Sequence, residues 1–380
     1  MTIKRLGVIR TIVLTLALAI SGTFYLFCDG AGPGQGISRG MTDQEIAAYL
    51  DSLLKDLAKK DMFSGAVLLA RGDKIIFKGA YGLANKQYDV PNRVDTKFNL
   101  GSMNKMFTAV AIAQLVEQGK LSYEDTVGKY LDSSWVQPQT AKKVKIEHLL
   151  THTSGLGNYF FGKFWNSSRL LYRSLDDWKP LIRDETPAFE PGTSWAYSNT
   201  GMFLLGPIIE KVTGQTYFDY VREHIHVPAG MINTDCYEMD RPVPNLAMGY
   251  IKEQDVKGAY WRSNIFDHVL KGGPAGGGFS TVEDLFRFAR ALMTNKLVSK
   301  KSVDLLTSPK PGLSSGYGYG FDIRRVKDDE VVGHSGGFPG INAILQIYKK
   351  SGYVYAILSN YTDGMRPVRV ILEDLLPKLL

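Results

Sequence analysis

Strand-like segments occur at both ends of the chain, and helix-like segments fill the part between them. Runs of β-branched and aromatic residues bounded by turn residues predict strands at 63–70, 74–81, 317–323, 331–333, 341–348 and 353–359. The turns between the late strands are short, which favours antiparallel pairing. We therefore predict an α+β fold in which both ends of the chain contribute to one antiparallel sheet, with an all-helical domain inserted between them.

Helices are predicted from apolar spacing and from capping residues. Thr42 and Glu45 form a capping-box pattern ahead of an amphipathic segment that ends near residue 61. Residues 103–118 are apolar on nearly every side, which predicts a buried helix. Further helices are expected at 201–212, 217–224, 282–293 and 367–380. N- and C-terminal helices then flank the sheet of an α+β domain made of residues 41–125 and 275–380, and residues 126–274 form the helical domain.

The first 40 residues have the pattern of an export signal followed by a linker. Lys4, Arg5 and Arg10 precede residues 11–28, which carry no charge and approach the minimum length of a membrane helix. Basic residues on that side keep the N-terminus in the cytoplasm. We therefore predict a signal peptide or membrane anchor at 1–28 and a flexible linker at 29–40. The remaining chain is then extracytoplasmic: secreted, periplasmic, or anchored through residues 11–28 to the outer face of the cytoplasmic membrane.

Charge and the few cysteines and histidines argue against several kinds of site. The net charge is +7, but no long run of basic residues exists, so no nucleic-acid partner is expected. Cys28 and Cys236 form no C-x-x-C pair, which excludes a zinc ribbon or a thioredoxin-like motif. His148 and His152 lack both a third ligand and an H-E-x-x-H context, so no metal site is expected. No pattern indicates an oligomeric state.

Two serine motifs compete as the nucleophile. Ser335 lies in a Gly-x-Ser-x-Gly sequence, but the α/β-hydrolase triad needs a later histidine, and none follows His334. Ser-x-x-Lys occurs at Ser52, within the amphipathic first helix, and at Ser102, which opens the buried helix. The spacing places Lys105 beside Ser102, and apolar surroundings lower the pKa of a lysine enough to make it a base. The alternative is that Ser102 only caps the helix and Lys105 reaches toward solvent.

Two further motifs each occur once, Tyr197-Ser198-Asn199 in a loop and His334-Ser335-Gly336 at the end of a predicted strand. Together with Ser102-x-x-Lys105 they resemble the serine β-lactamase and penicillin-binding protein superfamily, in particular class C-like enzymes, D-alanyl-D-alanine carboxypeptidases and related esterases. The resemblance runs over about residues 42–365, and the stretches 148–156 and 276–281 also look like family sequences.

This resemblance implies a β-lactamase/transpeptidase-like fold and an acyl-enzyme on Ser102 that needs no cofactor. Lys105 would be the partner of Ser102, and Tyr197 the general base, with its pKa lowered by the nearby lysine cation. Asn199 would contact the acyl group or Lys105. The backbone N–H groups of Ser102 and of Gly337, which follows the third motif, would form the oxyanion hole.

The third motif departs from many β-lactamases, because it begins with His334 rather than lysine. A neutral histidine offers a substrate carboxylate no permanent charge, so an efficient β-lactamase is less expected than an esterase or carboxypeptidase. The alternative is that His334 only packs.

An aromatic-rich loop either lines a pocket for an apolar acyl group or forms a domain interface. Its members are Tyr159, Phe160, Phe161, Phe164 and Trp165.

The expected function is therefore that of an exported serine hydrolase acting on esters or on peptide or amide bonds of a small-molecule or peptide acyl substrate. The alternative is a penicillin-binding sensor or scaffold that acylates or binds without turnover. An intact set of Ser102, Lys105, Tyr197 and Asn199 argues against a scaffold, since a non-catalytic protein has no need of all four.

Overall fold

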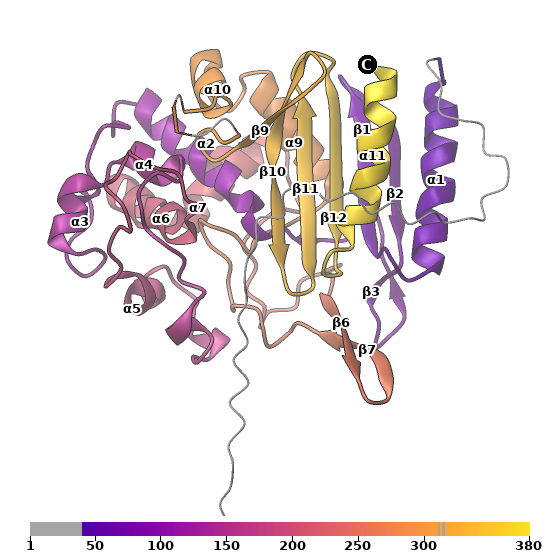
Figure 1. The fold of residues 1–380 in the computed structure, drawn as a ribbon, viewed down its shortest axis with the longest axis horizontal. Coiled ribbons are helices and arrows are strands. Elements are labelled where there is room, and N and C mark those ends of the chain that lie inside the picture. The colour runs from indigo at the N-terminus through magenta and orange to yellow at the C-terminus, as the bar shows by residue number, and fades with distance from the viewer. Residues whose placement is uncertain (1–39, 311, 314–315) are drawn as a thin grey trace, which may run out of the picture. The chain divides into compact units, whose positions relative to one another are not determined.

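The central sheet brings both ends of the chain together. The computed structural model describes residues 40–310, 312–313 and 316–380. Within these residues, six antiparallel strands are ordered β2–β1–β12–β11–β10–β9 (Figure 1). Their bounds are Lys74–Tyr81, Gly65–Arg71, Tyr353–Ser359, Ile341–Tyr348, Asp329–Phe338 and Asp322–Val326, respectively. The early hairpin pairs with the last strand through β1 and β12, which confirms the predicted α+β fold with an antiparallel sheet.

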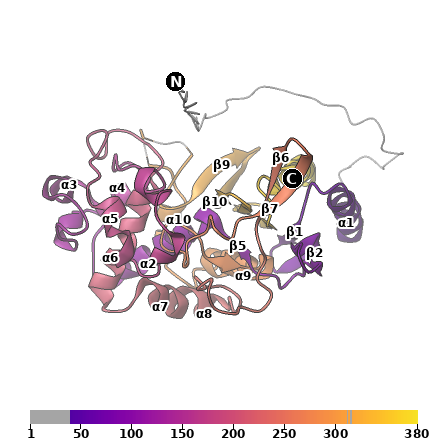
Figure 2. The same ribbon diagram turned by 90° about the horizontal axis from the view of Figure 1, so that it is seen from below.

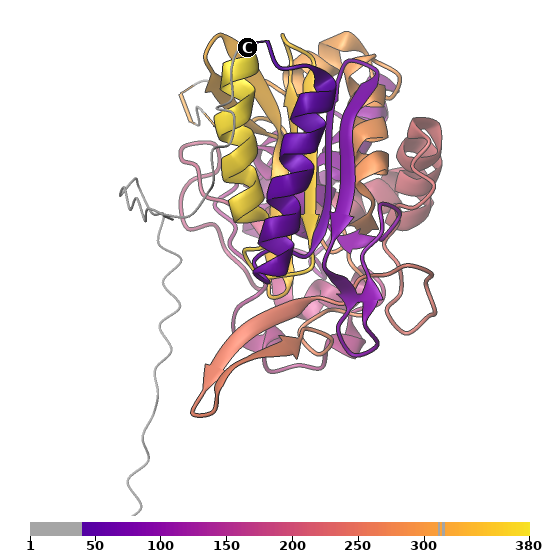
Figure 3. The ribbon, with the colours of Figure 1, turned by 90° about the vertical axis from the view of Figure 1, so that its right-hand side faces the viewer.

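Helices cover both faces of this sheet. α1 (Asp43–Lys59) and α11 (Met365–Leu379) lie on one face (Figure 3), where α1 contacts β2 and α11 contacts β11 and β12. On the opposite face, α9 (Val282–Met293) contacts β1 and β12. The predicted capping box of α1 is present. The Glu45 N–H donates to Thr42 Oγ1 at 3.3 Å, and the Thr42 N–H donates to the Glu45 carboxylate at 2.7 Å.

The apolar segment that predicted a buried helix forms α2 (Asn104–Glu117), preceded by the 3₁₀ turn η1 (Gly101–Met103). Every residue from 104 to 113 is buried. α2 contacts β10 as well as α6 (Asn199–Thr213) and α7 (Tyr217–Val221), so it joins the sheet to the helical part of the chain (Figure 2). This confirms the prediction that the helix is surrounded by protein.

The other elements are short. The remaining α-helices among the described residues are α3 (Pro138–Lys143), α4 (Ile146–Leu150), α5 (Lys179–Ile182), α8 (Val227–Ala229) and α10 (Lys300–Leu306). Further 3₁₀ turns span Val127–Lys129, Gly162–Phe164, Arg169–Leu171 and Asp176–Trp178, and a π-helical turn spans Arg222–His226. The small strands are β3 (Leu83–Asn85), β4 (Val90–Pro91), β5 (Phe98–Asn99), β6 (Tyr250–Asp255), β7 (Gly258–Ser263) and β8 (Phe279–Ser280).

Two strand predictions were wrong in their bounds, and one hairpin was not predicted. β9 begins at Asp322 rather than at residue 317, and β10 continues to Phe338, so His334-Ser335-Gly336 lies inside a strand. Glycine has low strand propensity, yet the backbone of β10 pairs with β11 over this whole stretch. The β6–β7 hairpin was missed because most of its side chains are polar and partly exposed, which leaves no apolar alternation to recognise.

The N-terminal predictions concern a part of the chain that the structure does not describe. The signal peptide or anchor at 1–28 lies outside the described residues, as does nearly all of the linker at 29–40. Among residues 40–310, 312–313 and 316–380, no helix combines the length and the apolar character needed to cross a membrane. The boundaries predicted between the α+β and helical domains stay predictions.

Leu372→Ala should destabilise the fold, because Leu372 is fully buried on the side of α11 that packs on the sheet. We expect the free energy of unfolding to fall by about 2–5 kcal/mol. Val370→Ala on the same helix is the matched control, since 67% of Val370 is exposed, and it should change the stability by less than about 0.5 kcal/mol. Chemical denaturation measures both variants, and equal midpoints would contradict this packing of α11.

Candidate active site

Glycine backbone holds the Ser102 turn against strand β10. Ser102 lies in η1, and Gly101 before it has a φ of +51°; a Cβ there would lie 2.8 Å from the Gly337 nitrogen. On β10, a Cβ on Gly336 would lie 1.9 Å from the Leu100 carbonyl oxygen and 3.0 Å from the Ser102 nitrogen. Glycine permits both the left-handed conformation and the close approach. The two predicted oxyanion-hole donors, the N–H groups of Ser102 and Gly337, are thereby brought to the same place.

Asn99 supports this turn from the other side. Its Oδ1 accepts from the Gly101 N–H at 2.9 Å, and its Nδ2 donates to the Gly277 carbonyl oxygen at 3.2 Å. The Gly277 N–H donates to the Gly101 carbonyl at 3.1 Å, and the Leu100 N–H donates to the Gly278 carbonyl at 2.7 Å. The glycine-rich stretch at 276–281 therefore braces the nucleophile turn. Asn99 could not be singled out from the sequence, because both of its partners are backbone groups, which every residue type offers.

Lys105 is fully buried, and its amine joins three segments. Nζ donates to Asn199 Oδ1 at 2.8 Å and to the Ala275 carbonyl oxygen at 2.5 Å, and it lies 5.0 Å from the ring centre of Tyr197. Burial lowers the pKa of Lys105 well below its ordinary value, and the negative charge of Asp322 offsets part of that shift. A neutral amine has two hydrogens for these two acceptors and keeps its lone pair, so it is able to act as a base.

Tyr197 contacts Ser102, but its acidity differs from the expectation. Burial raises the pKa of Tyr197, Asp322 raises it further, and hydrogen bonding to the Ser102 hydroxyl lowers it in part. Solvent limits the size of the shift, because 39% of Tyr197 is exposed. Lys105 was expected to lower this pKa, but a lysine that is itself shifted toward its neutral form supplies little positive charge. The phenol therefore holds its proton in the free protein.

His152 fixes the backbone on both sides of Tyr197. Its carbonyl oxygen accepts from the Ala196 N–H at 2.9 Å, its Nδ1 accepts from the Ser198 N–H at 3.2 Å, and its ring centre lies 4.3 Å from that of Tyr197. The residue is fully buried with a φ of +59°, and burial lowers the pKa of His152 well below its ordinary value. The neutral ring then carries its hydrogen on Nε2, which has no partner among the described residues. His152 is thus a positioning residue for Tyr197.

His334 is buried within β10, and the protein engages both of its ring nitrogens. Nδ1 lies 2.5 Å from the Ser335 carbonyl oxygen, which only accepts, so Nδ1 carries the hydrogen and Nε2 accepts from the Tyr317 hydroxyl at 3.1 Å. Burial lowers the pKa of His334, and Asp322, which accepts from the Ser335 N–H at 3.3 Å, acts in the other direction. The ring is neutral and its N–H is already used, so a substrate contact by His334 stays a prediction.

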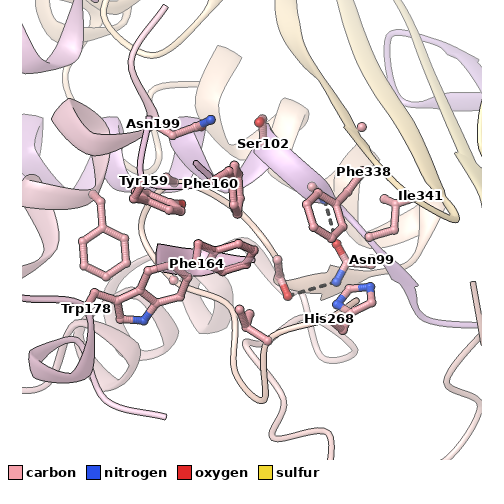
Figure 4. Close-up of a pocket in the computed structure, with 18 residues that line it drawn as sticks. Asn99, Ser102, Tyr159, Phe160, Phe164, Trp178, Asn199, His268, Phe338 and Ile341 are labelled. Carbon is pink, nitrogen blue, oxygen red and sulfur yellow. Dashed lines mark hydrogen bonds between the residues drawn. The ribbon is translucent and has the colours of Figure 1, made fainter. Parts of the chain in front are cut away.

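Ser102 opens into a cavity of about 540 Å³, part of it open to solvent, that Asn199 and Gly337 also border (Figure 4). Its walls are mainly aromatic, from Tyr159, Phe160, Phe164, Trp178, Phe203 and Phe338. Three members of the predicted aromatic loop are therefore lining residues. Phe161 and Trp165 are not among them, and 67% of Phe161 is exposed.

The rival motifs do not form sites. Ser52 and Lys55 are exposed on α1, where Lys55 pairs with Asp51 at 2.6 Å. His148 Nδ1 accepts from the Lys145 N–H at 3.2 Å. Within the described part of the chain, no group of three His, Cys, Asp or Glu side chains is arranged to hold a metal ion.

Comparison with known proteins identifies the family to which this site belongs. The family model described as Beta-lactamase matches residues 46–376. The chain belongs to the β-lactamase family. Members of this family are serine hydrolases and penicillin-binding proteins. The Ser102-x-x-Lys105 motif with its buried lysine fits this family.

The relatives of this chain include proteins named for different activities. Penicillin-binding protein 4* of Bacillus subtilis (strain 168) is 32% identical over 346 residues, which cover 87% of this chain and 75% of that protein. Esterase EstB of Burkholderia gladioli is 27% identical over 322 residues, 75% of this chain and 81% of that protein. The crystal structure of a penicillin-binding protein from Bacillus halodurans matches the fold with a TM-score of 0.75 at 31% identity, covering 83% of this chain and 98% of that chain. The family resemblance predicted from the motifs is confirmed.

His152→Leu should impair turnover more than His152→Asn. Asparagine places an amide oxygen near the position of Nδ1, which keeps an acceptor for the Ser198 N–H, and it tolerates a positive φ. Leucine has a similar shape without the acceptor. We expect kcat to be about tenfold to a hundredfold lower in His152→Leu than in His152→Asn, with a shifted pH profile, because misplacing Tyr197 disturbs proton transfer. Steady-state kinetics across pH measures this, with thermal denaturation to check folding; equal profiles would show that the Nδ1 bond does not position Tyr197.

The stability of the parent protein relative to Lys105→Met should increase with pH. The pKa of Lys105 is lower in the folded state than its ordinary value of 10.5, so between these two values the unfolded state binds more protons. The cost of burying the amine is complete below the folded-state pKa and disappears as the pH approaches 10.5. We expect the melting temperature of the parent minus that of the variant to rise between about pH 6 and pH 9.5. A constant difference would contradict a lowered pKa.

Proposed function

We propose that this protein is an exported serine hydrolase that cleaves ester bonds or peptide and amide bonds through an acyl-enzyme on Ser102. The observation that carries the proposal is the buried amine of Lys105, which donates to Asn199 and lies 5.0 Å from the ring centre of Tyr197. The interaction of the Tyr197 phenol with the Ser102 hydroxyl supports it. The paired N–H groups at Ser102 and Gly337 supply the second requirement, since an acyl carbonyl oxygen needs donors when it becomes negative.

The first half-reaction transfers the acyl group to the enzyme. Ser102 Oγ attacks the carbonyl carbon of the substrate and gives its proton to the phenol oxygen of Tyr197, which passes its own proton to the lone pair of Lys105. The carbonyl oxygen becomes negative and accepts from the Ser102 and Gly337 N–H groups. When the tetrahedral intermediate collapses, the bond to the leaving group breaks, and that group takes a proton back from the Tyr197–Lys105 pair.

The second half-reaction frees the enzyme with water. A water molecule attacks the ester carbonyl of the acyl-enzyme and gives a proton to the Tyr197–Lys105 pair, and Ser102 Oγ leaves with that proton. The product acid is released and all three side chains return to their starting protonation. The raised pKa of Tyr197 and the lowered pKa of Lys105 support this order, because the phenol acts as a relay and the amine as the final acceptor.

The environment of His334 supports substrates without a carboxylate at the leaving group. The ring is neutral and its N–H is donated to Ser335, so it offers such a carboxylate neither charge nor a hydrogen bond. We infer that esters and uncharged amides are turned over well and that β-lactams react slowly or act as acylating inhibitors. Export, the remaining part of the proposal, is supported by the uncharged segment at 11–28 behind three basic residues.

Turnover by purified protein on three substrates tests the proposal: a short-chain p-nitrophenyl ester, a chromogenic cephalosporin and a peptide ending in D-Ala-D-Ala. We expect multiple turnovers with the ester and a loss of several orders of magnitude in Ser102→Ala, because the acyl-enzyme cannot form. A stoichiometric burst that then stops would favour the sensor that acylates without turnover. Activity in Ser102→Ala equal to that of the parent would contradict the mechanism.

A further inference from the structure

The cavity beside Ser102 contains no charged side chain. Among the described residues that border it, none is an aspartate, glutamate, lysine or arginine. Its histidine, His268, is uncharged at neutral pH, because burial lowers the pKa of His268 to about 4. A charged group moved from water into such a cavity loses its hydration and finds no counter-ion, which costs binding free energy.

Charges close behind the cavity wall are already engaged. Glu185 accepts from the Thr200 hydroxyl at 2.8 Å and from the Gly157 N–H at 3.0 Å, so both of its oxygens are used. Asp267, next to His268 in the chain, pairs with Arg262 at 2.7 Å. On the other hand, the guanidinium of Arg169 lies 4.1 Å from the ring centre of Phe164, one of the lining residues. The guanidinium that lies against this ring is positive and repels an ammonium group.

The aromatic wall favours rings. Tyr159 and Trp178 meet with ring centres 4.8 Å apart at 70°, and Phe160 and Phe338 lie 5.3 Å apart. These rings present both faces and edges, which are the surfaces that bind another aromatic ring. Several of them come from the loop and helices of residues 159–203, whereas Phe338 comes from the end of β10 (Figure 4).

The position of the proton-transfer groups decides which part of a substrate enters the cavity. Lys105 and Tyr197 are not among its lining residues, but Ser102, Gly337 and Asn199 are. The leaving group must lie beside the Tyr197–Lys105 pair, because that pair returns a proton to it. The acyl group, on the other side of the carbonyl carbon, then lies in the cavity.

We propose that the cavity selects uncharged acyl groups that carry an aromatic or similarly bulky apolar side chain, and that the enzyme discriminates against acyl donors with a free α-ammonium group. This inference rests on the proposed acyl-enzyme function and names its substrate class: esters and amides of aromatic carboxylic acids whose amino group is acylated or absent, in preference to esters or amides of free amino acids.

Three methyl esters with the same ring and leaving group test the charge selection: those of N-acetyl-D-phenylalanine, D-phenylalanine and 3-phenylpropanoic acid, each with the L-counterpart where one exists. At pH 6.5 the α-amino group of the amino-acid ester is mostly protonated, because its ordinary pKa lies near 7.7–8.0. We expect kcat/KM for both uncharged esters to exceed that for D-phenylalanine methyl ester by at least about tenfold. As the pH rises to about 9, the gap should narrow, because the amine loses its charge.

A negative charge placed in the cavity should weaken this selection. His268→Glu and His268→Gln differ in charge and hardly in shape, so the glutamine variant is the matched control. We expect the ratio of kcat/KM for the D-phenylalanine ester over the N-acetyl ester to be several times higher in His268→Glu than in His268→Gln. The ratio removes any common loss of activity that results from replacing the imidazole.

A pair of neighbouring phenylalanines tests the preference for rings. Phe160 borders the cavity, whereas Phe161 points out of it with 67% of its surface exposed. For p-nitrophenyl esters of 3-phenylpropanoic and acetic acid, the preference for the phenylpropanoyl ester should fall several-fold in Phe160→Ala and stay unchanged in Phe161→Ala.

The outcomes separate this inference from the function on which it rests. If the esters are hydrolysed in a Ser102-dependent manner but the free amino-acid ester is equal or preferred, charge selection is refuted and the hydrolase stands. If acetyl and phenylpropanoyl esters are used equally well, the aromatic preference is refuted. If no ester is hydrolysed above the Ser102→Ala background, the proposed function fails and this inference fails with it.

Discussion

The burial of an amine beside a serine is the constraint on which the rest of this structure depends. An amine removed from water is tolerated only when its hydrogens find acceptors and its charge is suppressed. Asn199 at the start of α6 and the Ala275 carbonyl supply those acceptors. Two distant segments, those of Asn199 and Ala275, must therefore pack around α2 before the Lys105 amine has both of its acceptors. The packing that makes α2 a buried helix is the same packing that lowers the pKa of Lys105, which is the property that the proposed mechanism needs in a base.

A second constraint acts on the backbone. Two N–H groups must point at one oxygen, and here they come from η1 and from β10, which approach each other through Gly101 and Gly336. A side chain at either position would separate the two donors. β10 extends as far as η1 although several of its residues are glycines, which have low strand propensity. Pairing with β11 holds these glycines in the strand. The antiparallel sheet made from both ends of the chain thus holds the two proposed oxyanion-hole donors close to each other.

The sequence was sufficient to predict the elements that are determined by interactions between neighbouring residues. The Thr42–Glu45 capping box, the buried helix at 103–118 and the β1–β2 hairpin follow from neighbouring residues and formed as expected. The motifs also indicated that Lys105 and Asn199 lie in one site, and the two side chains are hydrogen-bonded to each other. The positioning roles of Asn99 and His152 could not be predicted, because their partners are backbone N–H and carbonyl groups, which any sequence contains. The acidity of Tyr197 was misjudged for a related reason: its surroundings, including Asp322, are assembled only in the folded protein.

Asp322 also shows why the resting site is kept almost free of charge. Its carboxylate lies where it raises the pKa of Lys105, His334 and Tyr197, opposing the effect of burial on the first two. At rest, the amine, the imidazole and the phenol are all uncharged. In the proposed mechanism, an ammonium forms at Lys105 and an oxyanion forms between Ser102 and Gly337 when Ser102 attacks, and only then does the field of Asp322 stabilise a cation. Interactions that strengthen as charge develops lower the barrier, whereas a charge present beforehand would also stabilise the ground state. The same reasoning applies to the uncharged cavity. A permanent charge on the acyl group would act on the site before the reaction as well as in the transition state, so it would not selectively lower the barrier.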